Sequence, residues 1–409
     1  MKKMFASFHY PQFRLYFVAS TFSNFAFAMQ NVAILWQLYE LTKSPLALGA
    51  IGLVTFIPIF LFSMIGGVVA DTSDRKILMV SAHILLAIFS AVFAFTTVNQ
   101  SITPTIIFIA LALSGAVDAF YLPARQSVLP TIVPKELFAN AASLNTTMWQ
   151  TSRVVGPAIA GFIIAAGTQY VYIVNTILFI LALAGMLVLK VSKAHMEKAP
   201  EINLQSLKEG IRFALSQPLI YSTMILDFTA TFFASASTLL PIYAADILHV
   251  GAKGLGILYA ASSVGSVITG VIISTYHNMK NQGKVILIAV FFFGLSTALF
   301  GISNSFMLSV IFLAITGACD MFSMVIRNVI RQMITPDHIR GRLSGIDMIF
   351  FMGGPLLGET EAGVTAHLFG VAPSVVIGGL ATMIITVLIA IYVPKLRKYN
   401  THVAPSLLS

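Results

Sequence analysis

The chain has few charged residues and a single cysteine. Of its 409 residues, 10% are Asp, Glu, Lys or Arg, whereas 57% are hydrophobic. A soluble domain of this size has too little interior to keep so much apolar surface from water, so a soluble globular class is excluded. Cys319 has no second cysteine with which to form an intramolecular disulfide.

Motifs of several enzyme classes are also missing from the sequence. No glycine-rich loop ends in Lys-Ser or Lys-Thr, as a nucleotide phosphate-binding loop does. The eight histidines form no pair at the helical spacing of a metal site, and no nucleophile-and-base motif is present. We therefore expect no enzymatic activity, no cofactor and no metal.

The sequence instead contains many long apolar stretches. Helices of about twenty residues cross the roughly 30 Å hydrocarbon layer, and helices satisfy their own backbone hydrogen bonds there. The alternating pattern of a membrane barrel is absent. The sequence thus predicts an all-α membrane protein with twelve spans, at 11–39, 46–70, 77–98, 104–128, 137–166, 170–189, 218–248, 254–275, 285–302, 306–334, 343–368 and 371–393.

The basic residues are distributed unevenly among the predicted loops. The formal net charge is +9, yet only Lys43 and Lys253 fall clearly in the loops of one side. Most other Lys and Arg residues lie in the alternate loops or the tails. The positive-inside rule then predicts that both termini are cytoplasmic. We interpret the charge as a topology signal and expect no nucleic-acid partner.

The predicted spans form two similar halves. The longest polar segment separates an N-terminal six-helix bundle at 1–190 from a C-terminal one at 218–409. We expect this cytoplasmic linker, 191–217, to contain a short amphipathic helix at 204–215. The segment GAVDAFYLPARQSVLPTIVP at 115–134 aligns without gaps on GACDMFSMVIRNVIRQMITP at 317–336. Such a parallel repeat of two bundles is typical of secondary transporters with a site between the halves.

Three groups of residues resemble a known transporter superfamily. The segment GGVVADTSDRKILMV at 66–80 is similar to the loop between helices 2 and 3 of the major facilitator superfamily. GPAIAG at 156–161 resembles the helix 5 motif of its antiporters and exporters. Segments 13–49, 123–145 and 153–161 resemble the branch that holds the enterobactin exporter and the macrolide efflux proteins. The matching motif residues are Gly67, Ala70, Asp71, Arg75, Lys76, Gly156, Pro157 and Gly161.

The resemblance implies a gate at the cytoplasmic side. It places Gly67 and Asp71 at the end of helix 2, with Asp71 contacting the start of helix 11. Arg75 is expected to pair with a carboxylate, and Asp118 and Asp347 are the two candidates.

The repeated aspartates and arginines within the spans are candidates for the same gate. Asp118 and Arg125, like Asp320 and Arg327, are seven residues apart and share a helix face. We expect them to close the cytoplasmic side, with direct substrate contact as the alternative.

Other ionisable and polar residues lie deeper in the predicted spans. A charge inside the membrane costs about 2.5–3.5 kcal/mol on the insertion scale, so each is a functional candidate. Asp227 is the first candidate for carrying a coupled proton and Glu359 the second, with helix contacts as the alternative. Arg153 is expected to alternate between partners. The amides of Asn24, Gln30 and Asn31 either bind substrate or bond neighbouring helices.

These features lead to a functional hypothesis. We expect a monomeric, multi-pass protein of the bacterial inner membrane that works by alternating access. It exports a small amphipathic organic molecule, such as a siderophore or drug, in exchange for protons, with membrane lipids as its surroundings. A lipid or lysolipid flippase on the same fold is the alternative, and a membrane enzyme or receptor is a third.

Overall fold

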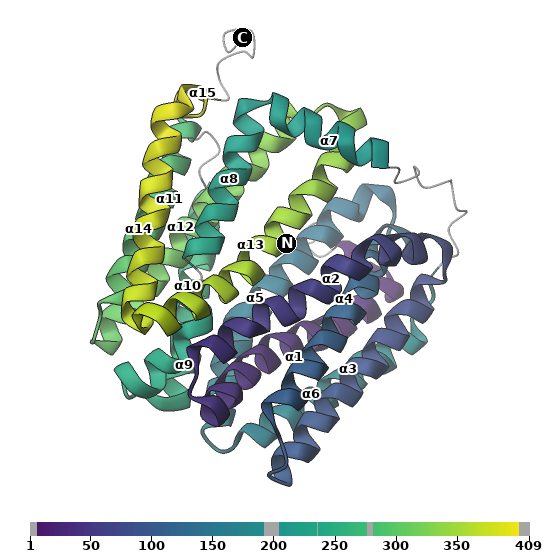
Figure 1. Ribbon diagram of the computed structural model, residues 1–409. Helices are drawn as coiled ribbons and strands as arrows, with labels where there is room; N and C mark the ends of the chain where they lie inside the picture. The colour runs from purple at the N-terminus through teal and green to yellow at the C-terminus, as the bar shows by residue number, and fades with distance from the viewer. Residues whose placement is uncertain (1–5, 192–203, 235, 276–280, 401–409) are drawn as a thin grey trace. The chain divides into compact units, whose positions relative to one another are not determined.

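The computed structural model describes residues 6–191, 204–234, 236–275 and 281–400 (Figure 1). For some of these residues, Asp71 and Asp347 among them, only the backbone is described. Every regular element in the described ranges is a helix. The fold class predicted from the sequence, an all-α protein, is confirmed.

Two compact units make up the chain. Unit 1 is Met1–Lys43, Leu53–Ala199 and Val250–Ala260, and unit 2 is Ser44–Gly52, Pro200–His249 and Ala261–Ser409. Each unit thus includes the first turns of one helix whose remaining turns belong to the other unit. The predicted division at 190 and 218 stays a prediction.

Six long helices form most of unit 1. They begin and end close to the first six predicted spans, because each starts after a polar turn or at a proline, which suits the first helical position. Their bounds are α1 Pro11–Thr42, α2 Pro45–Thr72, α3 Arg75–Val98, α4 Pro104–Ile132, α5 Phe138–Ile164 and α6 Thr168–Val188.

Unit 2 contains the second set of long helices and two short ones. The long helices are α8 Pro218–Phe233, α10 Gly251–Thr275, α11 Gln282–Gly301, α12 Phe306–Ile334, α13 Asp337–Phe369 and α14 Val371–Tyr392. The short helices α7 Leu204–Ser216 and α15 Pro394–Arg397 precede and follow them. Helix α7 coincides with the helix expected in the linker, whose amphipathic character stays a prediction, and residues 192–203 of the linker lie outside the described ranges.

Nine helical segments of the described chain are long and apolar enough to cross a membrane. The other three predicted spans correspond to α1, α5 and α13, which have 32, 27 and 33 residues. These three hold six of the polar residues singled out in the sequence, namely Asn24, Gln30, Asn31, Arg153, Asp347 and Glu359. Their crossing of the membrane stays a prediction, as does the cytoplasmic location of the termini.

The seventh predicted span differs from the prediction because it is not one continuous helix. After α8 ends at Phe233, the chain continues through η3 Ala236–Leu239, α9 Leu240–Ile242 and the π-helical turn η4 Tyr243–Ile247. Pro241, which has no backbone N–H to donate, lies at the start of α9. Asp227 lies in the regular part of this span.

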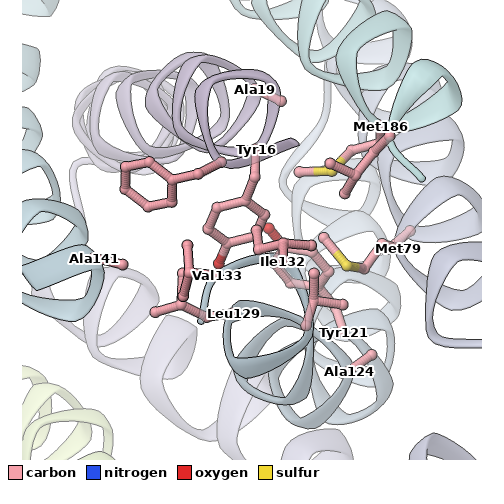
Figure 2. Packing of buried hydrophobic residues seen from close by; sticks show 14 of the residues in the cluster. Tyr16, Ala19, Met79, Tyr121, Ala124, Leu129, Ile132, Val133, Ala141 and Met186 are labelled. Atoms are coloured by element: carbon pink, nitrogen blue, oxygen red, sulfur yellow. The ribbon is translucent and has the colours of Figure 1, made fainter. Parts of the chain in front are cut away.

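Close packing around α1 forms the core of unit 1 (Figure 2). Tyr16 of α1 and Tyr121 of α4 are each 1% exposed and lie among Met79 of α3 and Met186 of α6. Two tyrosine hydroxyls are therefore enclosed within an otherwise apolar cluster. A buried tyrosine hydroxyl of this kind usually has a polar partner.

Candidate functional site

The loop between α2 and α3 is held within unit 1. Asp74 caps α3, because its carboxylate accepts a hydrogen bond of 2.9 Å from the backbone N–H of Lys76. The Arg75 guanidinium donates to the Ser127 carbonyl of α4 at 3.0 Å, and the Lys76 ammonium donates to the Leu187 carbonyl of α6 at 2.6 Å. Together these contacts join the start of α3 to the ends of α4 and α6.

This arrangement gives Arg75 a backbone carbonyl as a partner, and its expected pairing with Asp118 or Asp347 stays a prediction. The predicted bridge to Asp118 is not among the ion pairs of the side chains that the structure describes. The carbonyl oxygens near a helix end attract a cation, which accounts for the observed partner. The side chains of Asp71 and Asp347 lie outside the description, so their gate roles stay predictions.

The two glycines before this loop have different surroundings. A Cβ on Gly67, the motif glycine, would meet no atom within 4 Å. A Cβ on Gly66 would instead clash with the Ala119 carbonyl of α4. Gly66 is therefore the residue that allows α2 and α4 to approach, and the motif comparison pointed to its neighbour.

A buried ion pair lies in unit 2. The Arg327 guanidinium of α12 is 2.6 Å from the Asp227 carboxylate of α8, and the two side chains are 3% and 6% exposed. Arg327 also donates to the Ser323 hydroxyl at 2.8 Å. Asp320, whose side chain is 47% exposed, is farther from the same guanidinium at 3.9 Å.

The repeat pairs Asp320 with Arg327 along α12, but Asp227 makes the shorter contact. Sequence spacing within one helix revealed the first pairing and not the second, because Asp227 comes from a different helix. Ser323, one turn before Arg327, was not singled out in the sequence analysis. Its spacing of four residues from Arg327 is the signal that identifies it.

The corresponding arginine of unit 1 has a neutral partner. The Arg125 guanidinium of α4 donates to the amide oxygen of Asn24 in α1 at 3.1 Å. Arg125 is partly exposed and Asn24 is 5% exposed. Asp118 is also partly exposed, and no ion pair joins it to Arg125 in the described part of unit 1.

The remaining predicted polar residues are spread over several environments. Gln30 is 7% exposed, whereas Asn31 is exposed, so the two neighbours on α1 do not share one site. Arg153 of α5 is exposed and lies over the Trp149 ring, 4.8 Å from its centroid. The roles proposed for Gln30, Asn31 and Arg153 stay predictions.

Glu359 lies where α13 packs against the first turns of α2, within unit 2. Its carbonyl oxygen would be 3.0 Å from a Cβ on Gly49, and one residue further the Thr360 hydroxyl donates to the Gly49 carbonyl at 3.0 Å. The backbone around Glu359 therefore contacts a neighbouring helix, as the alternative role for this residue expects. The proton role of the Glu359 carboxyl itself stays a prediction.

The helix 5 motif packs against two neighbours in unit 1. A Cβ on Gly156 would be 2.7 Å from the Ala28 Cβ of α1, and one on Gly161 would be 2.7 Å from the Gly256 Cα of α10. Pro157 is buried between these positions and contributes its carbonyl to the Gly256 contact. The glycines thus let α5 approach two helices closely.

Metal ligands are not gathered in the described part of the chain. There, no three His, Cys, Asp or Glu side chains are placed to share a metal ion. The buried polar groups of α1, α4, α8 and α12 instead offer ion pairing and hydrogen bonding. These interactions suit the binding of charged or polar solutes and of protons.

The family described as "transmembrane secretion effector" matches residues 2–407. The chain belongs to this family. It is 26% identical over 403 residues to the protein named enterobactin exporter EntS in Shigella boydii serotype 18, covering 96% of this chain and 94% of the relative. The similarly named protein of Citrobacter koseri is 25% identical over the same shares.

Solved structures of major facilitator transporters show the same fold. The nucleoside transporter NupG superposes with a TM-score of 0.70 at 14% identity, covering 95% of this chain and all of that one. A bacterial homologue of the human lysosomal transporter Spinster gives 0.71 at 13% identity, covering 95% and 96%. The protein is therefore a secondary transporter. It is a multi-pass protein of the bacterial inner membrane and not an enzyme.

Proposed function

We propose that this transporter exports a small amphipathic organic molecule, a siderophore being the first choice, in exchange for protons. The buried Asp227–Arg327 pair carries the proposal. The enterobactin named for the relatives supports the choice of cargo. Polar side chains on otherwise apolar helices suit the binding of a molecule that has both polar and apolar surface.

The coupling step follows from the chemistry of the ion pair. A proton taken up by the Asp227 carboxylate neutralises it and leaves the Arg327 guanidinium without its counter-charge. An unpaired buried charge is costly, so protonation favours a conformation in which Arg327 finds another partner or water. A ligand shifts such an equilibrium only when it binds the two states differently. Proton and cargo then alternate by favouring opposite states of the transporter.

Transport in liposomes tests this proposal. Purified protein would be reconstituted in vesicles with an imposed pH gradient, and enterobactin movement measured. We expect accumulation that collapses with the gradient. Asp227→Asn is expected to abolish the proton dependence. Glu359→Gln tests the second candidate for carrying the proton.

A matched acidic residue supplies the control. Glu361 accepts a hydrogen bond from Thr365 within α13, at 2.8 Å, and contacts neither member of the ion pair in the described contacts. Glu361→Gln is expected to keep proton-driven transport. Full proton-driven transport by Asp227→Asn would remove Asp227 from the mechanism. Movement of a labelled lysolipid that ignores the pH gradient would replace the proposal with the flippase alternative.

A further inference from the structure

The two halves of the chain place an arginine at corresponding positions and give it different partners. Arg125 and Arg327 occupy the same place in the aligned repeat, and each contacts the first helix of its own half, α1 or α8. The partner is the amide of Asn24 in unit 1 and the carboxylate of Asp227 in unit 2. The positive charge is thus neutralised in unit 2, whereas in unit 1 it meets a neutral group.

The surroundings of Arg125 contain hydrogen-bonding groups without partners. The Oγ atom of Ser20 and the Nδ2 atom of Asn24 are buried and bond no other group in the described part of the chain. The hydroxyls of Ser23 and Tyr121 are buried beside them and interact with each other. All four residues are at most 5% exposed. Buried polar groups are normally paired, so the two unpaired groups on α1, one turn apart, call for an occupant.

The chemistry of these groups indicates what the occupant is. Asn24 uses its oxygen to accept from Arg125, so its free atom is a donor. Hydroxyls of Ser and Tyr are also donors, and the Tyr16 and Tyr121 hydroxyls lie within hydrogen-bonding reach of the guanidinium. A guanidinium surrounded by hydroxyl and amide donors is complementary to an oxyanion, such as a carboxylate or phenolate.

Another polar group borders this set on α3. His83 is fully buried, packs edge-on against the Tyr121 ring with centroids 5.3 Å apart, and bonds the Met79 carbonyl through Nδ1 at 2.7 Å. A carbonyl only accepts, so Nδ1 carries the proton and Nε2 has no partner in the described residues. When the ring is neutral, its Nε2 atom accepts a hydrogen bond from a hydroxyl beside the anionic group.

We propose that Arg125, Asn24 and their hydroxyl neighbours bind an acidic group of the exported molecule. The inference rests on the proposed export function and names the class of its cargo. Arg125 is partly exposed and so can be reached, whereas Arg327 is closed off by Asp227. The ligand's oxyanion takes in unit 1 the place that the Asp227 carboxylate holds in unit 2.

A matched pair of aromatic probes tests this site without requiring transport. Salicylate carries a carboxylate beside a hydroxyl, and salicylamide carries a neutral amide in its place. Binding would be measured by titration calorimetry on the full chain in a neutral detergent free of anionic lipid. We expect salicylate to bind at least about tenfold more tightly than salicylamide, since charge-assisted hydrogen bonds are the stronger ones.

Substitutions at Asn24 separate the site from general damage. Asn24→Asp supplies an internal counter-charge, so we expect salicylate affinity to fall about tenfold or more while the thermal midpoint without probe stays the same or rises. Arg125→Gln is expected to lose salicylate binding. Asn99→Asp, in the exposed turn after α3, is the matched charge control and is expected to bind as the wild type does.

Three outcomes would overturn the inference. They are equal binding of the two probes by the wild type, unchanged salicylate binding by Asn24→Asp and Arg125→Gln, and displacement of salicylate by neutral analogues at equal concentration. Competition by phosphatidylglycerol but not by soluble aryl acids would assign the site to a lipid headgroup instead. Binding without proton-driven transport would keep this site and reject the proposed coupling.

Discussion

At the scale of the residue, the partner of each arginine determines whether its charge is neutralised: Asn24 has an amide nitrogen where Asp227 has a second carboxylate oxygen. Asn24 and Asp227 have nearly the same shape, but only Asp227 cancels the charge of its arginine. Removing one member of a buried ion pair leaves an uncompensated charge, which costs more than the pair itself contributes. The stability of unit 2 should therefore depend on keeping both members or neither.

We predict that Asp227→Asn and Arg327→Gln each destabilise the protein by about 3–5 kcal/mol. The double variant should lie closer to the wild type than the sum of the two, because neither charge is left unpaired. Thermal unfolding in detergent, followed as a double-mutant cycle, measures this coupling.

Asp320→Asn provides the comparison for this cycle. That carboxylate is 47% exposed and 3.9 Å from Arg327, so its loss should cost about 0–1 kcal/mol. Additive effects of the two buried substitutions would show that Asp227 and Arg327 do not stabilise each other.

At the scale of the element, glycines determine how closely the helices approach. Gly115 of α4 and Gly317 of α12 correspond in the repeat, and each allows its helix to approach a neighbouring helix closely. A Cβ on Gly115 would lie 2.7 Å from the Thr55 carbonyl of α2, and one on Gly317 would clash with the Ser262 carbonyl of α10. The Ser266 hydroxyl also donates to the Gly317 carbonyl at 2.8 Å. The repeat thus preserves a helix crossing as well as charges.

We predict that Gly317→Ala destabilises the protein by about 1–3 kcal/mol, because the added methyl group forces α12 away from α10. The thermal midpoint and the yield of folded protein measure the effect. Gly67→Ala is the matched control, since its methyl group meets no atom within 4 Å, and it should behave as the wild type. A Gly317→Ala variant as stable as the control would mean that this crossing relaxes without cost.

At the scale of the whole molecule, the loop charges bear on orientation in the membrane. Ser73, between α2 and α3, lies within a charge-rich segment, whereas Ser101 lies between α3 and α4 in a loop without Lys or Arg. Both residues are exposed. Because α3 alone separates them, the two loops lie on opposite faces if α3 crosses the membrane once.

We predict that Ser101→Cys is labelled from outside the cell and Ser73→Cys is not, in a Cys319→Ser background. The reagent is a membrane-impermeant maleimide applied to spheroplasts, and permeabilised cells show that both sites react when reached. The single natural cysteine makes this background a one-residue change. Labelling of Ser73→Cys in intact spheroplasts would contradict the cytoplasmic placement of the termini.

The sequence by itself determined the helices and the superfamily. Apolar length and polar turns predicted the helix bounds closely, because a membrane helix satisfies its backbone within its own residues. The break after Phe233 was not predicted, since small residues such as Ala and Ser also occur within continuous membrane helices. The repeat also marked Arg125 and Arg327 as corresponding residues before any contact was known.

Only the tertiary structure decided which groups meet. The partner of Arg327 is Asp227 from another helix, the partner of Arg75 is a carbonyl, and the close-packed glycine is Gly66 rather than Gly67. Spacing along one helix defines a shared face, but contacts between helices depend on rotation and crossing. Those follow from packing over the whole unit, which no single segment contains.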